Sequence, residues 1–485
     1  MRCTAQRQNS PTKADAIPAD LLDAVRLLRR GTVLVVGDAM LDRYVYGRVE
    51  RISPEAPVPV LAVERDVALP GGAGNVVRNL TALGAAVAFV SIVGDDQAGS
   101  DLTGLIGGQP GVEPWLLVQG GRATTTKTRF VASGQQLLRA DHEQVSPIHH
   151  RLADRLIRIA ADAVAATTVM VLSDYRKGVL AGDTPARLIA AARAAGRKVV
   201  VDPRGGEPGR FAGADLIMPD CAELALSTGL PAGTDAEIAV AAHALRSAHG
   251  FGAVLVLRGE AGVTLVDADD AAASPGEAAS AGTAAARHLP ADVAEMIDPS
   301  GAGDAVIAVA AAGLAVGLSL PVVARLGALA AGIAMGKSGI GVVREDEFVE
   351  VLTPGRLAAR KLASRGQGAE RVEGWRRAGH RVGFLAASTA AEDPGVLIRA
   401  RAWCDRLVIG VADGDPTAQG LAEQPAVDLV IRYGTEGTVD LIRLLRPDVL
   451  VQDPGRAPET VAGGDIMQEW GGTVRRASPE PDLGF

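Results

Sequence analysis

Cysteine and aromatic residues are scarce in this sequence, and each shortage excludes a class of protein. The 485 residues include three cysteines, Cys3, Cys221 and Cys404, which lie far apart and form no CxxC pair. This pattern excludes a disulfide framework and a cysteine-type zinc site, and it is typical of a reducing cytoplasm. Aromatic residues make up 3% of the chain and hydrophobic residues 48%, so we expect cores filled by alanine, valine and leucine.

Basic clusters and long apolar runs are also missing. The formal net charge is -8 and no block of lysine and arginine occurs, which argues against a general nucleic-acid-binding protein. The apolar run 305–316 is shorter than the ~20 residues that a membrane-spanning helix needs. The N-terminus lacks the pattern of a signal peptide. We therefore expect a soluble cytoplasmic protein with neither nucleic acid nor membrane as a partner.

The clearest chemical signal is the stretch DPSGAGD at 298–304, which leads into that apolar run. A helix that begins here would offer unpaired backbone N–H groups and the positive end of its dipole to an anion. Gly301 and Gly303 would let a phosphate approach the backbone closely. Asp304 in the first turn could take a proton from a hydroxyl that attacks this phosphate. Taken alone, a GxGD segment is more often only a turn that caps a core helix.

Two other phosphate-binding motifs do not fit. The dinucleotide fingerprint needs a third glycine where Val306 stands. The stretch GIAMGKS at 332–338 resembles a P-loop, but residue 331 is alanine, so its two glycines are one residue too close. The stretch also continues an alanine-rich helical run instead of following a strand, so we discount it.

Polar residues in the first third of the chain suggest a binding site for a phosphorylated acceptor. Asp42 follows a buried strand at 32–36, where α/β sheets bind ligands, although a capping role is about as common for a lone aspartate. Lys127 and Arg129 alternate along a predicted strand and share one face, which suits an anionic group on the acceptor. Two cations on such a face usually mean only that the face is solvated.

A glycine-rich loop opens the next predicted helix. Gly71 and Gly72 would let a substrate contact the backbone. The amide of Asn75 can both donate to and accept from a hydroxyl. The segment 53–60 before this loop contains three prolines, which cannot sit in a central strand, so we expect an edge or crossing segment there.

The remaining sequence divides into α/β units. Apolar strands alternate with helices from residue 151, as is typical of a doubly wound sheet with its site along one edge. The predicted parts are a disordered tail at 1–20, a first α/β domain at 21–352, a linker or linking helix at 353–373 and a smaller α/β domain at 374–485. A surface loop rich in alanine, serine and glycine is expected at 267–292.

Seven short motifs follow one another between residues 31 and 350. They are GDAMLDRYVYG (37–47), RISPEAPVPV (51–60), GGAGNV (71–76), TKTR (126–129), LSDYRKG (172–178), DPRG (202–205) and DPSGAGD (298–304). In this order they resemble ribokinase-like carbohydrate kinases, and more narrowly the kinase half of bifunctional heptose 7-phosphate kinase/heptose 1-phosphate adenylyltransferases. The resemblance implies a ribokinase-like doubly wound sheet with a small β lid, and a homodimer.

The resemblance also implies roles for the candidate residues. Asp304 would be the catalytic base. The anion hole would consist of the amides of Gly301, Ala302 and Gly303. The sugar would be held by Asp42, Gly71, Gly72 and Asn75.

The same resemblance assigns a nucleotide site. Asp220 and Glu223 would organise Mg²⁺ and the phosphates of ATP, and the turn of Arg258 and Gly259 would lie along the nucleotide. Related kinases usually have asparagine where Asp220 stands, in an N-x-x-E arrangement. The additional charge of the aspartate either draws Mg²⁺ closer or weakens nucleotide binding, and the sequence favours neither outcome.

The C-terminal part resembles the nucleotidyltransferase half of the same family, a Rossmann-like α/β domain, without its chemical groups. That half carries an HxGH motif after its first strand, whereas this chain has no histidine after His380. The segment 417–425, where a cation-rich stretch is expected, contains no lysine or arginine. Such groups are each worth orders of magnitude in rate, so we expect an inactive adenylyltransferase-like domain.

The leading interpretation is an ATP- and Mg²⁺-dependent sugar kinase. It would phosphorylate the anomeric hydroxyl of D-glycero-D-manno-heptose 7-phosphate, giving the 1,7-bisphosphate for ADP-heptose and lipopolysaccharide core biosynthesis. One alternative is a fully bifunctional kinase and adenylyltransferase, which the missing histidines argue against. Another is a non-catalytic sugar-phosphate-binding scaffold, which would follow if Asp220 prevented nucleotide binding.

Overall fold

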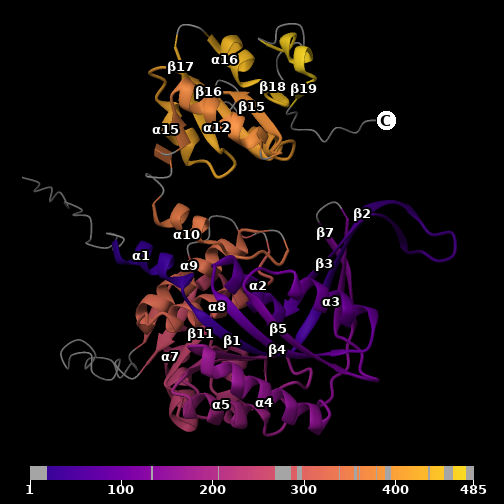
Figure 1. Cartoon of the computed structure of the whole chain (residues 1–485), viewed down its shortest axis with the longest axis vertical. Helices are drawn as coiled ribbons and strands as arrows, with labels where there is room; N and C mark the ends of the chain where they lie inside the picture. The colour runs from indigo at the N-terminus through magenta and orange to yellow at the C-terminus, as the bar shows by residue number, and fades with distance from the viewer. Residues whose placement is uncertain are drawn as a thin grey trace, which may run out of the picture. The chain divides into compact units, whose positions relative to one another are not determined.

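The computed structural model describes residues 19–132, 135–205, 207–267, 286–291, 296, 298–337, 339–353, 358–359, 361–377, 379–387, 395–434, 437–452 and 463–476. The chain divides into two compact units, Met1–Phe348 and Val349–Phe485 (Figure 1). The tail at 1–18 and residues 268–285 and 292 of the expected surface loop lie outside the described residues, whereas residues 287–289 of that loop form a short strand.

The first unit is built on one large sheet. In spatial order, its described strands are β13 (Arg287–Leu289), β12 (Val263–Val266), β11 (Ala253–Leu257), β10 (Leu216–Ile217), β9 (Lys198–Pro203), β8 (Val169–Asp174), β1 (Thr32–Gly37), β4 (Ala86–Gly94) and β5 (Val112–Gln119). All neighbours from β11 to β5 pair in parallel. The central strands are buried along their length because helices cover both faces.

Helices pack on both faces of this sheet, so the predicted doubly wound fold is confirmed (Figure 1). One face carries α4 (His150–Ala166), α5 (Thr184–Ala194) and α7 (Asp235–His249). The other carries α1 (Ala19–Leu28), α2 (Ala73–Ala82), α8 (Ala302–Ala315) and α9 (Leu320–Met335). The discounted P-loop-like stretch lies largely in α9, as its helical pattern predicted. The sheet is not parallel throughout, although a parallel sheet was predicted: at one edge, β12 pairs antiparallel with both β11 and β13.

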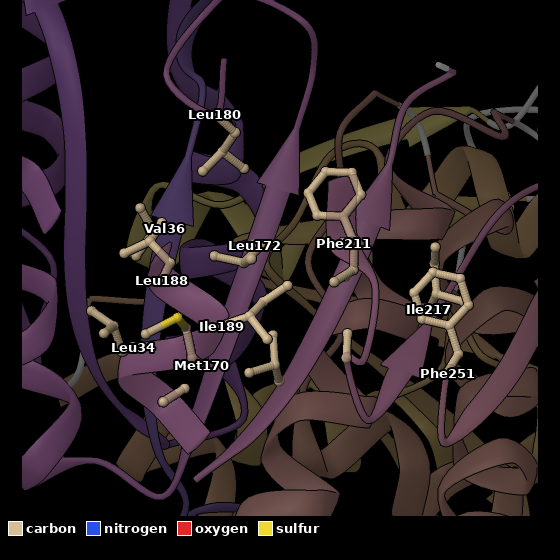
Figure 2. Close-up of a cluster of buried hydrophobic side chains, with 14 of the residues drawn as sticks. Leu34, Val36, Met170, Leu172, Leu180, Leu188, Ile189, Phe211, Ile217 and Phe251 are labelled. Atoms are coloured by element: carbon tan, nitrogen blue, oxygen red, sulfur yellow. The ribbon is translucent and has the colours of Figure 1, made fainter. Parts of the chain in front are cut away.

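A continuous aliphatic core joins the sheet to the helices on the α4–α5–α7 face (Figure 2). In this view, Met170 and Leu172 of β8 lie beside Leu188 and Ile189 of α5. All four residues are at most 3% exposed. Each fully buried leucine or isoleucine contributes about 1.5–3 kcal/mol relative to exposure. The strands are therefore firmly held, which fixes the points at which loops leave their carboxyl ends.

A second sheet, of four described strands, forms what we call the lid. Its spatial order is β3 (Pro59–Gly72), β2 (Ala39–Ile52), β6 (Thr126–Ala132) and β7 (Gln135–His142). The β2–β3 hairpin projects from the unit (Figure 1). Only Asp38 separates β1 from β2, so the chain passes directly from the large sheet into the lid. The proline-rich segment forms the hairpin turn and the start of the edge strand β3, as predicted.

The second unit is a smaller α/β domain whose described strands are all parallel. Their spatial order is β14 (Leu362–Ala363), β17 (Leu429–Tyr433), β16 (Arg406–Ala412), β15 (Val382–Ala386), β18 (Val449–Gln452) and β19 (Thr473–Arg476). Its helices include α12 (Arg365–Arg377), α14 (Gly395–Arg401), α15 (Thr417–Glu423) and α16 (Gly437–Leu445).

The segment expected as a linker or linking helix, 353–373, contains the strand β14 and most of the helix α12. The sequence signal for this helix is weak, because the helix is rich in arginine and glycine and buries only Gly368 and Val372. Within the described parts of both units, no helix combines the length and apolarity needed to cross a membrane.

Candidate active site

The candidate site is built around the start of α8. Gly301 precedes the helix with φ of 81°, in the left-handed region that favours glycine. The carboxylate of Asp298 holds the turn by accepting hydrogen bonds from the N–H groups of Ser300 (2.8 Å) and Gly339 (3.2 Å). Among the described residues, no side chain caps α8. The backbone N–H groups at this positive helix end are therefore not occupied by a capping side chain and can face an anion.

Asp304 lies in the first turn of α8 and is 6% exposed. Its Oδ1 accepts a hydrogen bond from the Tyr175 hydroxyl at 2.6 Å, and its Oδ2 accepts one from the Asn75 amide at 2.7 Å. Arg204 approaches Oδ1 to 3.5 Å. Donors on both oxygens fix the orientation of this carboxylate, as a general base requires.

A cavity of about 320 Å³ lies against Asp304. Its walls come from the lid, from the turn before α8 and from the loops that follow β8 and β9. The lining residues are Met40, Asp42, Gly72, Lys127, Arg129, Arg139, Tyr175, Arg204, Pro299, Ser300, Gly301, Gly303, Asp304 and Ile340. Seven of the predicted site residues are therefore brought together: Asp42, Gly72, Lys127, Arg129, Gly301, Gly303 and Asp304.

Three cations of the lid line this cavity. Lys127 pairs with Asp141 at 2.9 Å, and Arg129 pairs with Asp42 at 2.5 Å. Burial raises the pKa of Asp42, and the hydrogen bond from Arg129 opposes that rise. Arg139 lies directly opposite Arg129 in the β6–β7 pairing. Sequence patterns did not identify it as a site residue, because every described side chain of β7 is exposed and the strand has no buried face that would mark the site. The carboxylates hold these cations in place on the cavity wall.

Residues of the glycine-rich loop pack against two carboxylates of the site, Asp42 and Asp304. A Cβ on Gly71 would lie 1.7 Å from the Asp42 carboxylate, so only glycine leaves room for it. Sequence reasoning predicts that Asn75 contacts a sugar hydroxyl. The structure instead buries Asn75 completely, because its amide nitrogen donates to Asp304 and its oxygen accepts from Arg78 at 2.9 Å.

Tyr175 and Arg204 line the cavity, although the sequence suggested no role for either. Each follows the carboxyl end of a parallel strand, and this placement is the signal that could have identified them. The Arg204 guanidinium lies 5.2 Å from the centre of the Tyr175 ring and its Nε 3.3 Å from Asp202. Burial raises the pKa of Asp202 to about 7, and the charge of Arg204 opposes this rise.

Asp220 and Glu223 form a capping box at the start of α6 (Cys221–Thr228). The N–H of Glu223 donates to Asp220 at 2.8 Å, and the N–H of Asp220 donates to Glu223 at 2.9 Å. The second oxygen of Glu223 accepts from the N–H of Gly205 at 3.0 Å. Burial raises the pKa of Glu223. Both residues lie outside the lining of the 320 Å³ cavity.

The turn of Arg258 and Gly259 is a neighbour of this capping box. Asp220 forms an isolated parallel bridge with Leu257, the last residue of β11. Arg258 pairs with Asp235 and donates to the Thr264 hydroxyl at 3.2 Å. Gly259 has φ of 58°, and no atom lies within 4 Å of where a Cβ would stand. The surface beside Gly259 is therefore open to a ligand.

Residues 30–346 match the family described as pfkB family carbohydrate kinase. The chain belongs to this pfkB family. It is therefore a sugar kinase. Over both units it is also similar to the Bifunctional protein HldE of Acidiphilium cryptum, with 50% identity over 95% of this chain and 96% of that protein. The Bifunctional protein HldE of Paramagnetospirillum magneticum is 44% identical over 94% of each chain. The resemblance predicted from the motifs is thus confirmed.

Solved structures support the fold of the pfkB unit. Arabidopsis thaliana ribokinase complexed with ribose and ATP superposes with a TM-score of 0.51 at 20% identity, covering 67% of this chain and 99% of the ribokinase. Escherichia coli phosphofructokinase-2 in complex with substrates and products gives 0.54 at 19% identity, covering 67% and 98%. At these identities the likeness shows a ribokinase-like fold.

The sheet of the second unit contains a topological switch point. The strand order reverses between β15 and β18, where doubly wound folds bind nucleotides. The stretches that follow these strands, 388–394 and 453–462, are outside the described residues. A cavity of about 470 Å³ lies elsewhere in the unit, beside β14 and the ends of β16 and β17.

Proposed function

We propose that this kinase transfers the γ-phosphoryl group of ATP to the anomeric hydroxyl of a heptose 7-phosphate, for ADP-heptose and lipopolysaccharide core biosynthesis in the cytoplasm. The observation that carries the proposal is the 320 Å³ cavity, which has Asp304 and the open start of α8 on one wall. Its lid wall holds Lys127, Arg129 and Arg139. A substrate with a reactive hydroxyl at one end and a phosphate at the other matches this polarity.

The chemistry follows from these positions. The sugar hydroxyl loses its proton to Asp304 as its oxygen attacks the γ-phosphorus, and ADP leaves. The amides of Gly301, Ala302 and Gly303 oppose the charge on the transferring oxygens, as helix starts do for anions. Asp42 accepts hydrogen bonds from the sugar on the opposite wall. Positioning and electrostatics supply most of the acceleration in phosphoryl transfer.

Mg²⁺ fits the residues present. The described part of the chain contains no group of three or more potential metal ligands. Mg²⁺ in kinases is bound largely by substrate phosphates and water, with one or two carboxylates, so such a group is not required. Asp220 and Glu223 are the carboxylates that would organise it. When bound, the ion would neutralise charge on the phosphates of ATP.

A phosphotransfer screen tests the proposal. The purified chain, ATP and Mg²⁺ are combined with heptose 7-phosphate, unphosphorylated heptose, fructose 6-phosphate or ribose, and ADP release is measured. Heptose 7-phosphate is expected to give the highest kcat/KM, with the new phosphate at C1 by ³¹P NMR. Equal or higher kcat/KM with an unphosphorylated sugar would contradict the proposal. Binding of the sugar phosphate without any turnover would favour the scaffold alternative.

Replacing both Lys127 and Arg129 by alanine is expected to raise the KM for the sugar phosphate at least about 10-fold, since charge-assisted hydrogen bonds are worth about 1.5–3 kcal/mol each. The KM for ATP should change much less. Arg43→Ala is the matched control, because Arg43 lies beside Asp42 on β2 and is absent from the cavity lining. Equal effects on both substrates, or no effect, would mean that the two cations only stabilise the lid.

We further propose that the chain forms a homodimer through the lid. Apolar side chains near the hairpin tip are exposed, with Ile52 at 63%, Val63 at 60% and Val58 at 50%, and such surfaces mark contact sites. The double variant Ile52→Glu/Val63→Glu should be a monomer by size-exclusion chromatography with light-scattering detection, while the wild type should be a dimer. Val240→Glu, on α7 and 49% exposed in wild type, should leave the dimer intact. A monomeric wild type would refute the proposal.

A further inference from the structure

Tyr175 lines the cavity, and its hydroxyl donates a hydrogen bond to the carboxylate of Asp304. The O–H donates to Oδ1 at 2.6 Å, the shorter of the two close hydrogen bonds on this carboxylate. Burial, followed by the charge of Asp304, raises the pKa of Tyr175 well above its usual value of 10. The phenol therefore keeps its proton and donates at any pH at which the protein would work.

The backbone around Tyr175 is fixed by buried polar contacts. The carboxylate of Asp38 accepts hydrogen bonds from the N–H groups of Tyr175 (2.9 Å), Lys177 (3.0 Å) and Val179 (3.0 Å). Arg176 between them has φ of 58°, which is rare for a residue other than glycine. Such a conformation persists only where surrounding contacts determine it. The loop after β8 is thus built to hold the phenol in one direction.

The two oxygens of Asp304 have different surroundings. Oδ1 accepts from Tyr175 and has Arg204 at 3.5 Å. Oδ2 accepts only from the Asn75 amide among the described residues. The direction of that amide is settled by Arg78, which donates to the Asn75 oxygen. A carboxylate oxygen accepts about two hydrogen bonds, so Oδ2 keeps room for one more donor.

We propose that Tyr175 is a positioning residue for phosphoryl transfer, which holds Oδ1 of Asp304 so that Oδ2 takes the proton from the acceptor hydroxyl. The inference rests on the proposed function of Asp304 as base. As the acceptor oxygen bonds to the γ-phosphorus, the bond from that phosphorus to the β,γ-bridging oxygen breaks and ADP carries away its electron pair. The proton of the acceptor passes to Oδ2, and Tyr175 keeps its own proton throughout.

Tyr175→Phe tests the inference because it removes the hydroxyl and keeps the ring. The kcat is expected to fall about 10–100-fold, the range for a hydrogen bond to a charged group. The KM values for ATP and for the sugar phosphate should change by less than about 3-fold, because neither substrate loses a partner. The acid limb of the pH profile of kcat should move to higher pH, since a carboxylate that loses a donor holds a proton more tightly.

Tyr46→Phe is the matched control. Tyr46 lies in the lid strand β2, outside the cavity lining, so its variant should keep wild-type kcat and pH profile. A Tyr175→Phe enzyme with wild-type kcat would overturn the inference. A fall in kcat with an unshifted acid limb, or with equal changes in both KM values, would also overturn it, because loss of packing alone produces that result.

The double variant Tyr175→Phe/Asp304→Asn separates this inference from the proposed function. If the tyrosine acts through the base, its removal should have almost no effect once Asp304 is asparagine, because residues that act as a unit are not additive. The same fold-loss in both backgrounds would overturn the role of Tyr175 and leave the base assignment intact. Near-wild-type turnover of the single variant Asp304→Asn would instead refute the proposed function.

Discussion

Asp304→Asn is expected to lower kcat by about 10²–10⁴-fold, the usual contribution of a general base, while ATP and the sugar phosphate still bind. The loss should appear in kcat and in kcat/KM alike, because the proton is transferred only in the transition state. The folded state should also lose about 1–3 kcal/mol. An asparagine that accepts from Tyr175 turns its own amide toward the Asn75 amide, which Arg78 prevents from rotating.

Kinetics, calorimetric ATP binding and thermal unfolding together check this expectation. Asp66→Asn is the control, since Asp66 is an exposed lid carboxylate paired with Arg43, and its variant should stay within about 2-fold of wild type. Turnover of Asp304→Asn within a few-fold of wild type would remove Asp304 from the role of base. Lost ATP binding would mean that the carboxylate acts chiefly through the nucleotide.

The second unit is expected to show no adenylyltransferase activity. Given heptose 1-phosphate, ATP and Mg²⁺, the chain is expected to release no pyrophosphate above background. Two missing imidazoles, each worth about 10²–10⁴ in rate, would leave adenylyl transfer too slow to detect. The sequence has no histidine after His380, although the strands of the second unit and their buried apolar residues are in place.

A coupled pyrophosphate assay checks this expectation on the same preparation that phosphorylates heptose 7-phosphate, so that inactive protein is excluded. Using Asp304→Asn in parallel removes ATP consumption by the kinase unit. Pyrophosphate formed together with ADP-heptose would favour the bifunctional alternative, with which the name of the HldE relatives agrees. The chemistry would then come from side chains other than histidine.

Sequence patterns predicted the secondary structure best where burial is uniform. The buried strand expected at 32–36 appears within one residue of those bounds as β1 (Thr32–Gly37), which is buried along almost its whole length. The antiparallel edge formed by β12 and β13 was missed because β13 is three residues long and half-buried. A helix near α12 was expected only as one alternative to a linker, because its sequence has almost no apolar face.

At the site, the motif residues were predictable and their partners were not. The sequence places Asp304 and Gly301 at a helix start, where local geometry determines their environment. Tyr175 and Arg204 reach the same carboxylate from strands 129 and 100 residues away along the chain. Such pairings depend on sheet order, which local patterns do not encode. In the same way, the sequence suggests that Asn75 binds the substrate, whereas the structure buries its amide against Asp304 and Arg78.

Helix α8 is buried on all sides, with neighbours in α9, α2 and the strands β1, β8 and β9. Beyond the open first turn, we therefore expect its backbone amide hydrogens to exchange with solvent when the whole unit unfolds, whereas the outer lid strands β3 and β7 expose an edge. Asp304 thus belongs to the part of the unit that opens last, and the cations of the lid belong to a part that opens earlier. A mutation that destabilises the lid would be tolerated locally, but one in α8 would lower the free energy of unfolding of the entire domain.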